Sequence, residues 1–356
     1  MLGSRLGKAD VFRPLSASVK AFGGWEFALL VLLVVEIVAF SQGEYGFWLG
    51  GAGALTQLQQ FIGIAVASMG LGLVILTGGI DLSIGSVASL TGVVMARLWA
   101  SGLNIWVAVL IALVVACAIG TLNGLIITYG KLHPLIVTLV TMFVVSSVAE
   151  VVVGTPMPYV FPSNFVNLGM GAYHSIPWSV MVFVVVAICA GYLVGFTTFG
   201  RELLMIGSNP VAAAYAGIRV RRVLVIDYTL CALSAGIAGI LMSALYASAR
   251  GDLAAHLLLP ALTAVVLGGV DIFGGSGRVR GMVLGVLLIG FLQQGMMLYG
   301  VNAVDVQLVT GILLGAAVVT KNMSGSQRFT RRLRGLRHTN VPPPVPNELE
   351  ASKVAS

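Results

Sequence analysis

The sequence predicts an all-α polytopic membrane protein with about ten transmembrane helices. Of its 356 residues, 58% are hydrophobic and only 9% are charged, and the mean hydropathy is +1.00. Soluble domains carry about 25% charged residues, so this composition excludes a water-soluble globular protein and a disordered chain. The chain contains 45 glycines, which suits membrane helices whose backbones pack closely against one another.

Ten apolar segments follow a polar N-terminal segment, 1–24. A helix that spans the membrane needs about 20 apolar residues. The predicted spans are 25–40, 55–76, 82–100, 104–128, 134–153, 177–196, 223–247, 254–270, 281–299 and 303–320. Only TGGID separates the second from the third, so one broken helix is an alternative there. The eighth is short, and a re-entrant segment is its alternative.

The distribution of basic residues predicts which side each loop faces. Ten spans put both termini on one side, together with 18 of the 20 Lys and Arg residues. Only Arg97 and Arg250 fall on the other side, where the longest loop, 154–176, contains no Lys or Arg. The positive-inside rule therefore predicts that both termini are cytoplasmic.

The chain divides into an N-terminal segment, a transmembrane domain and a tail. The transmembrane domain covers 25–320, and the tail, 321–356, begins with the basic run RFTRRLRGLR and continues with VPPPVP. This composition predicts a disordered cytoplasmic tail that rests on anionic lipid headgroups. Binding of a specific partner is the alternative.

One short motif occurs twice, as GGIDLSIGS at 78–86 and as GGVDIFGGS at 268–276, with five of nine positions identical. Broken helices at matching positions often mark the pathway in transporters. We expect each aspartate to N-cap the following helix. Two tight Gly-rich turns with capping aspartates and no solute contact are the alternative to a place in the pathway. The candidate pathway residues are Gly78, Gly79, Asp81, Ser83, Gly268, Gly269 and Asp271.

The segment 200–222, GRELLMIGSNPVAAAYAGIRVRR, predicts a short cytoplasmic helix. Ser208 or Asn209 is a suitable N-cap, Pro210 suits the first helical turn, and Gly217 suits the end. The small side chains of VAAAYA would fit a narrow groove in another protein. An ordinary connecting loop is the alternative.

Three motifs together resemble the permease subunits of bacterial ABC importers for ribose and similar small sugars. They are GGIDLSIGS, GRELLMIGSNPVAAAYAGI and AVVLGGVDIFGGSGRVRG, and the resemblance covers about residues 25–320. Leu258 and Pro260 stand where the ribose-type pattern has acidic residues. However, WEFALLVLLVVEIVAF, SARGDLAAHLLLPALTAVVLGG and LLIGFLQQGMMLYGV resemble one branch, the D-type permeases of autoinducer-2 import systems, in which two different permeases pair.

The resemblance implies a multi-pass inner-membrane permease that moves a small polar solute, autoinducer-2, by alternating access. Its implied partners are a second, different permease chain, two ATPase subunits, a periplasmic solute-binding protein and the lipid bilayer. The resemblance also assigns ATPase coupling to 209–218 and its surroundings. The candidate coupling residues are Arg201, Gly207, Asn209, Pro210, Ala213, Gly217 and Ile218.

The chain itself is not expected to be an enzyme or to hold a cofactor. It lacks GxxxxGK[ST], and its four histidines show no metal-binding spacing, so neither nucleotide nor metal binding is predicted. The net charge of +7 reflects cytoplasmic loops, and no nucleic-acid partner is expected. A permease for ribose or another monosaccharide is the runner-up. A proton-coupled carrier would rest on Glu36, since Asp81 and Asp227 are predicted at the ends of spans.

Overall fold

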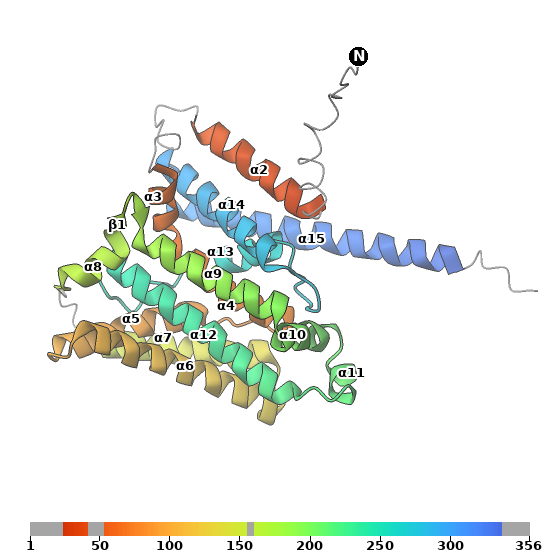
Figure 1. Ribbon diagram of the computed structural model, residues 1–356, viewed down its shortest axis with the longest axis horizontal. Coiled ribbons are helices and arrows are strands. Elements are labelled where there is room, and N and C mark those ends of the chain that lie inside the picture. Colours follow the sequence, from red (N-terminus) through yellow and green to blue (C-terminus); the bar gives the residue numbers. More distant parts are fainter. Residues whose placement is uncertain (1–23, 42–52, 155–159, 337–356) are drawn as a thin grey trace, which may run out of the picture. The chain divides into compact units, whose positions relative to one another are not determined.

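The computed structural model describes residues 24–41, 53–154 and 160–336 (Figure 1). Most of the predicted N-terminal segment and the end of the predicted tail lie outside these residues. The chain forms two units, 1–314 and 315–356, and every site discussed below belongs to the first. Fourteen helices make up nearly all of the described structure, as the sequence predicted for an all-α protein.

Six helices are long and apolar enough to cross a membrane. Each of them coincides with a predicted span, so the protein is a polytopic membrane protein. They are α2 (Gly24–Ser41), α6 (Ile105–Gly130), α7 (Pro134–Val153), α9 (Trp178–Phe196), α12 (Val220–Leu245) and α14 (Val279–Leu298).

The four remaining predicted spans fall on helices with shorter apolar stretches. These are α4 (Ile62–Leu76), α5 (Ile84–Ala100), α13 (Leu258–Leu267) and the start of α15 (Ala303–Leu336). α4 and α5 are separate helices. The 10 residues of α13 extend only about 15 Å, half of a hydrocarbon core of roughly 30 Å. The eighth predicted span is therefore only partly helical, because turns at 254–257 precede its helix.

The helix α15 also runs further than predicted, to Leu336, where the sequence indicated a disordered tail. The other elements are short. They are the helices α3 (Gly53–Gln60), α8 (Ser163–Met170), α10 (Thr198–Ser208) and α11 (Pro210–Tyr215) and the strands β1 (Ala172–Tyr173) and β2 (Ile176–Pro177). The two strands pair antiparallel within the predicted 154–176 loop, and nothing in the sequence pattern indicated them.

The helix α12 lies at the centre of the packing and is the most buried of the six long helices. Figure 1 shows it beside α6. Gly63 of α4 faces Met242 near the end of α12, whereas Gly79, just after α4, faces Tyr228 near its start. Therefore α4 and α12 run in opposite directions.

On another side of α12, α5 runs in the same direction as α12. Its Ala88 packs against Gly239, and its Gly92 packs against Ser243. Consequently α4 and α5 point in opposite directions on different sides of α12. The stretch 77–83 passes between them and joins the end of α4 to the start of α5.

A second group of helices packs around α14, with α2 lying alongside it (Figure 1). The indole Nε1 of Trp25 donates a 2.9 Å hydrogen bond to the carbonyl of Leu267 at the end of α13. Further along α2, the ring of Phe40 lies 5.8 Å from that of Tyr299. At the start of α2, Glu26 also pairs at 3.7 Å with Arg278, directly before α14, so α2 runs parallel to α14.

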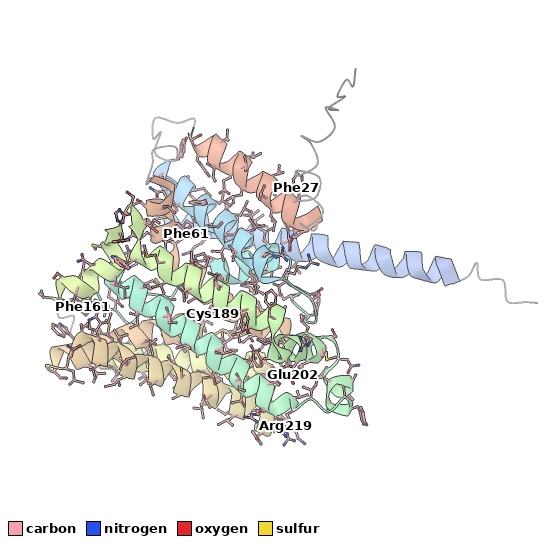
Figure 2. All side chains as sticks on the ribbon, in the orientation of Figure 1. Phe27, Phe61, Phe161, Cys189, Glu202 and Arg219 are labelled. Atoms are coloured by element: carbon pink, nitrogen blue, oxygen red, sulfur yellow. The ribbon has the colours of Figure 1, made fainter. Side chains whose placement is uncertain are left out.

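The two ends of the helical unit differ in character. Figure 2 shows Glu202 and Arg219 at the end where α10 and α11 lie, which we call the α11 end. Phe161 lies near α8 at the opposite end, which we call the α8 end. The repeated Gly-Gly turns lie at the α11 end, because Gly207 of α10 packs against Leu76 and Gly275. The segment 200–222 and both repeats therefore come together in space.

Candidate functional site

The short helix predicted within 200–222 is present as α11. The side-chain Oδ1 of Asn209 accepts hydrogen bonds of 3.0 Å from the backbone N–H groups of Val211 and Ala212. Pro210 occupies the first helical turn, where it needs no hydrogen-bond partner for its nitrogen. Of the two N-caps that the sequence allowed, the structure has Asn209.

The other end of α11 is closed by a Schellman motif around Gly217, whose φ is +85°. The N–H of Gly217 donates to the carbonyl of Ala214 at 3.0 Å, and the N–H of Ile218 donates to that of Ala213 at 3.1 Å. Gly217 thus ends the helix as predicted. Because both ends are satisfied internally, this helix of six residues keeps its form at the protein surface.

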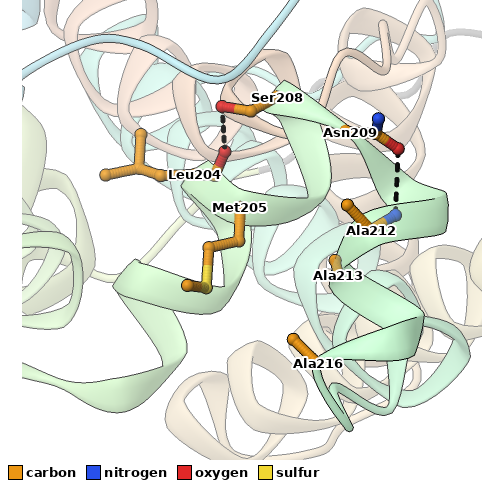
Figure 3. A pocket seen from close by; sticks show the side chains of 7 residues that line it. All are labelled: Leu204, Met205, Ser208, Asn209, Ala212, Ala213 and Ala216. Carbon is orange, nitrogen blue, oxygen red and sulfur yellow. Dashed lines mark hydrogen bonds between the residues drawn. The ribbon is translucent and has the colours of Figure 1, made fainter.

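An open groove of about 400 Å³ lies between α10 and α11 (Figure 3). Its walls are mostly apolar and small. The lining residues are Leu204, Met205, Ser208, Asn209, Ala212, Ala213 and Ala216. Its size and its position at the α11 end suit the insertion of a partner's side chains.

Ala213 lines this groove, yet little of it reaches the surface. It is only 4% exposed, because it packs inside its own chain. The apolar side chains that α11 exposes are Val211 and Tyr215, at 62% and 89%. Arg201 is exposed, and Ile218 is half-buried.

Gly207 lies at the point where α10 meets both repeated turns. A methyl group on Gly207 would collide with the carbonyl oxygen of Leu76 and the amide nitrogen of Gly275. Between the two turns, the N–H of Gly275 donates a 2.9 Å hydrogen bond to the carbonyl of Leu76, and Gly274 packs against Gly78. We call this meeting point of 76–78, 207–208 and 274–275 the glycine junction.

The glycines of both repeats end the helices that precede them. Gly78 has φ +79° after α4, and Gly269 has φ +91° after α13. The N–H of Gly79 donates to the carbonyl of Val74 at 3.1 Å. The same helix-ending motif closes α13. Both copies therefore end a helix, although the left-handed residue is the first glycine of the pair in one copy and the second in the other.

The aspartates of the repeats do not cap the following helices as predicted. Oδ1 of Asp81 accepts from the N–H of Ser83 at 2.9 Å and from its hydroxyl at 2.6 Å, just before α5 begins. Oδ1 of Asp271 accepts from the N–H of Phe273 at 3.1 Å, well before α14 begins at Val279. Each aspartate accepts a hydrogen bond from the N–H two residues further on and so closes a turn within its own loop. The prediction that these aspartates cap the following helices was wrong.

A buried polar cluster next to the first turn was missed at the sequence level. Asp81 and Asp227 are 1% and 0% exposed, and Oγ1 of Thr77 donates to Oδ2 of Asp227 at 3.3 Å. Oδ1 of Asp227 and the hydroxyl of Tyr228 are buried without a hydrogen-bond partner among the described residues. The sequence placed these acids at helix ends, because it did not reveal that 77–83 folds against α12.

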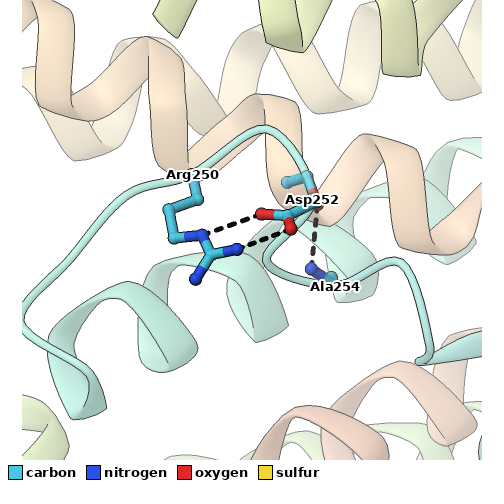
Figure 4. A network of polar contacts seen from close by, with 4 residues as sticks. Arg250, Asp252 and Ala254 are labelled. Carbon is cyan, nitrogen blue, oxygen red and sulfur yellow. Dashed lines mark hydrogen bonds and ion pairs between the residues drawn. The ribbon is translucent and has the colours of Figure 1, made fainter. Parts of the chain in front are cut away.

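The two basic residues that the charge pattern placed opposite the termini have local partners. The Arg97 guanidinium donates to the carbonyls of Val152 and Val153 at the end of α7, at 2.6 and 2.7 Å. Arg250 makes a bidentate pair with Asp252, at 2.9 and 2.6 Å (Figure 4), and this donation lowers the pKa of the Asp252 carboxyl. Arg97 is thus held by two backbone carbonyl groups, and the charge of Arg250 is paired with a carboxylate.

The fold and this arrangement define a polytopic membrane protein with a rigid, capped surface helix. Residues 53–318 match the family described as "Branched-chain amino acid transport system / permease component". The chain is 35% identical over 313 residues to the autoinducer 2 import system permease protein LsrD of Escherichia coli K12, which covers 85% of this chain and 93% of LsrD. LsrD of Shigella flexneri gives the same values, and LsrD of Escherichia coli O157:H7 is 34% identical.

The chain therefore belongs to this family of permease components. It is a multi-pass protein of the bacterial inner membrane with a role in transport. The resemblance drawn from the GGIDLSIGS, GRELLMIGSNPVAAAYAGI and AVVLGGVDIFGGSGRVRG motifs is confirmed.

Proposed function

We propose that this protein is one permease subunit of an ABC importer and moves autoinducer-2 across the inner membrane by alternating access. The observation that carries the proposal is the 35% identity with LsrD, a permease of an autoinducer-2 import system, over 85% of this chain. ATP hydrolysis would belong to a separate subunit, since this sequence contains no phosphate-binding loop.

A topology of ten crossings with cytoplasmic termini fits the contacts within the helical unit. Successive apolar segments alternate in direction, as α4, α5 and α12 illustrate. The start of α2 and the start of α14 lie together, because Glu26 pairs with Arg278 at 3.7 Å. The α11 end would then be cytoplasmic, where the positive-inside rule also puts most of the basic residues.

The groove between α10 and α11 would receive the ATPase subunit. Movement of α11 would reach α10 directly, and Gly207 at the end of α10 contacts both repeated turns. Close backbone contacts without intervening side chains transmit displacement with little loss, because packed interiors resist compression. ATPase closure would thereby shift α4 and α14 together, which is the rigid-body movement that alternating access requires.

The remaining partners are a second, different permease chain, two ATPase subunits and a periplasmic binding protein. The test is reconstitution of this chain with these subunits in ATP-loaded vesicles, followed by uptake of labelled autoinducer-2. We expect uptake that requires ATP and every subunit. Uptake of ribose but not of autoinducer-2 would overturn the assigned solute. Uptake without an ATPase subunit would overturn the assigned class.

A further inference from the structure

A second cavity of about 310 Å³ lies at the far end of α4 from the glycine junction. It is an open cavity, lined by the beginning of α4, the ends of α12 and α14, the beginning of α15 and the segment 246–257. Known small-molecule sites begin at about 300 Å³. The cavity is therefore large enough for one small solute.

The lining of the cavity is mostly apolar, but hydrogen-bonding side chains from several different segments reach it. Five hydrogen-bonding side chains line it, and no Asp, Glu, Lys or Arg is among its described lining residues. Gln293 also donates to Oγ1 of Thr310 at 2.9 Å, so its amide is held in place. The five polar lining residues are Gln60, Tyr246, His256, Gln293 and Gln307.

One wall of the cavity is non-helical backbone that descends between helices. The N–H of Ala254 donates to Oγ of the buried Ser89 at 2.9 Å, and Gly85 packs against the carbonyl of Ala254. Ser89 lies eleven residues before the end of α5 at Ala100, which corresponds to about 16 Å along the helix. Irregular backbone at such depth is tolerated where it is buried in protein or lines a water-filled cavity.

From these observations we infer that this cavity binds the transported solute, and that it selects a small, neutral, hydroxyl-rich molecule. The inference rests on the proposed function. Amide and imidazole groups can donate to and accept from hydroxyl and carbonyl groups of a solute. A solute that carries a carboxylate or a phosphate would lose its hydration on entering the cavity and would find no charged side chain there, which costs free energy. The cavity thus favours a sugar-like solute over an amino acid.

Gln307 is the most informative position for substitution. Its replacement by Leu keeps the side-chain size and removes hydrogen bonding. Gln294 offers a matched control, because it lies next to Gln293 on α14 but outside the cavity. In the reconstituted complex, we expect Gln307→Leu to reduce autoinducer-2 uptake about twofold to tenfold, the loss of one hydrogen bond. Gln294→Leu should match the parent both in uptake and in binding-protein-stimulated ATP hydrolysis.

A second measurement does not depend on transport. Gln307→Cys should react with a hydrophilic thiol reagent in the full complex, and millimolar autoinducer-2 should slow that reaction, whereas leucine should not. Equal reaction rates with and without autoinducer-2, or parent-like uptake by Gln307→Leu, would overturn the cavity as the solute site. If the parent complex itself takes up no autoinducer-2, the proposed function fails instead.

Discussion

The backbone N–H of Gly275 donates a 2.9 Å hydrogen bond to the carbonyl oxygen of Leu76, which joins two turns that the sequence repeats 190 residues apart. Gly207 packs into the same place from α10. Three segments distant in the sequence therefore meet through backbone atoms. A side chain added there would have to displace backbone atoms, so a substitution in the glycine junction should lower the stability of the protein.

We predict that Gly207→Ala destabilises the protein and impairs transport. The added methyl group would collide with backbone atoms of Leu76 and Gly275, and overpacking of this kind costs about 1–3 kcal/mol. Thermal unfolding of the detergent-purified complex and ATP-driven uptake are the measurements. Both should fall below the parent values.

Gly195 in α9 is the control for this substitution, since nothing lies within 4 Å of a methyl group added there. Gly195→Ala should leave uptake unchanged and leave stability equal or higher, because alanine favours helix by up to about 1 kcal/mol. Equal effects of the two substitutions would contradict the close packing at the glycine junction.

Much of the fold could be predicted from the sequence, because hydrophobic length and turn chemistry are local. Each predicted span coincides with a helix, and Asn209, Pro210 and Gly217 take the positions around α11 that their chemistry favours. The length of α13 could not be derived in this way. The sequence 254–270 is mostly apolar, yet its first residues form turns that pack against α5, a tertiary contact with no local signal.

We predict that Ala212→Arg abolishes stimulation of ATP hydrolysis by the loaded binding protein. Ala212 is exposed and lines the groove between α10 and α11, so a long charged side chain there would block a closely packed partner. Ala214→Arg on the same helix is the control, because Ala214 is exposed but lies outside the groove. Assembly and stimulation should be normal in the control. Normal stimulation of ATP hydrolysis in Ala212→Arg would show that the groove takes no part in coupling.

The energy source can be tested independently of any substitution. We predict that uptake into ATP-supplied vesicles persists when an uncoupler collapses the proton gradient, and stops when ATP is depleted. A proton relay needs a chain of polar groups in contact, whereas both carboxylate oxygens of Glu36 are buried without a hydrogen-bond partner among the described residues. Loss of uptake on uncoupling alone would favour a proton-coupled carrier.

The site was harder to predict than the fold, because its parts are distant in sequence. Asp81 and Asp227 fell at the ends of predicted spans, where an acid is usually hydrated. Both are buried, because 77–83 folds against the first turns of α12. The roles of Gly78 and Gly207 likewise depend on contacts between segments, which spacing within one segment does not reveal.

The final prediction concerns the two aspartates of the repeats. If each serves to close its turn, Asp81→Asn and Asp271→Asn should retain most uptake, because an amide oxygen accepts the same hydrogen bonds. Asp81→Ala should be more harmful than Asp271→Ala. It would leave the N–H and hydroxyl of Ser83 without their partner in a buried place, at a cost of about 1–3 kcal/mol.

If the aspartates instead carry charge in the transport cycle, Asn and Ala should be equally damaging at each position, since both remove the charge. Uptake normalised to membrane-inserted protein separates the two cases, and thermal unfolding of the same variants reports the turn itself. We expect stability and uptake to fall together in the Ala variants and to stay near the parent values in the Asn variants. A stable Asp81→Asn protein without uptake would show that the carboxylate has a role beyond its turn, and it would draw Asp227 beside it into the mechanism.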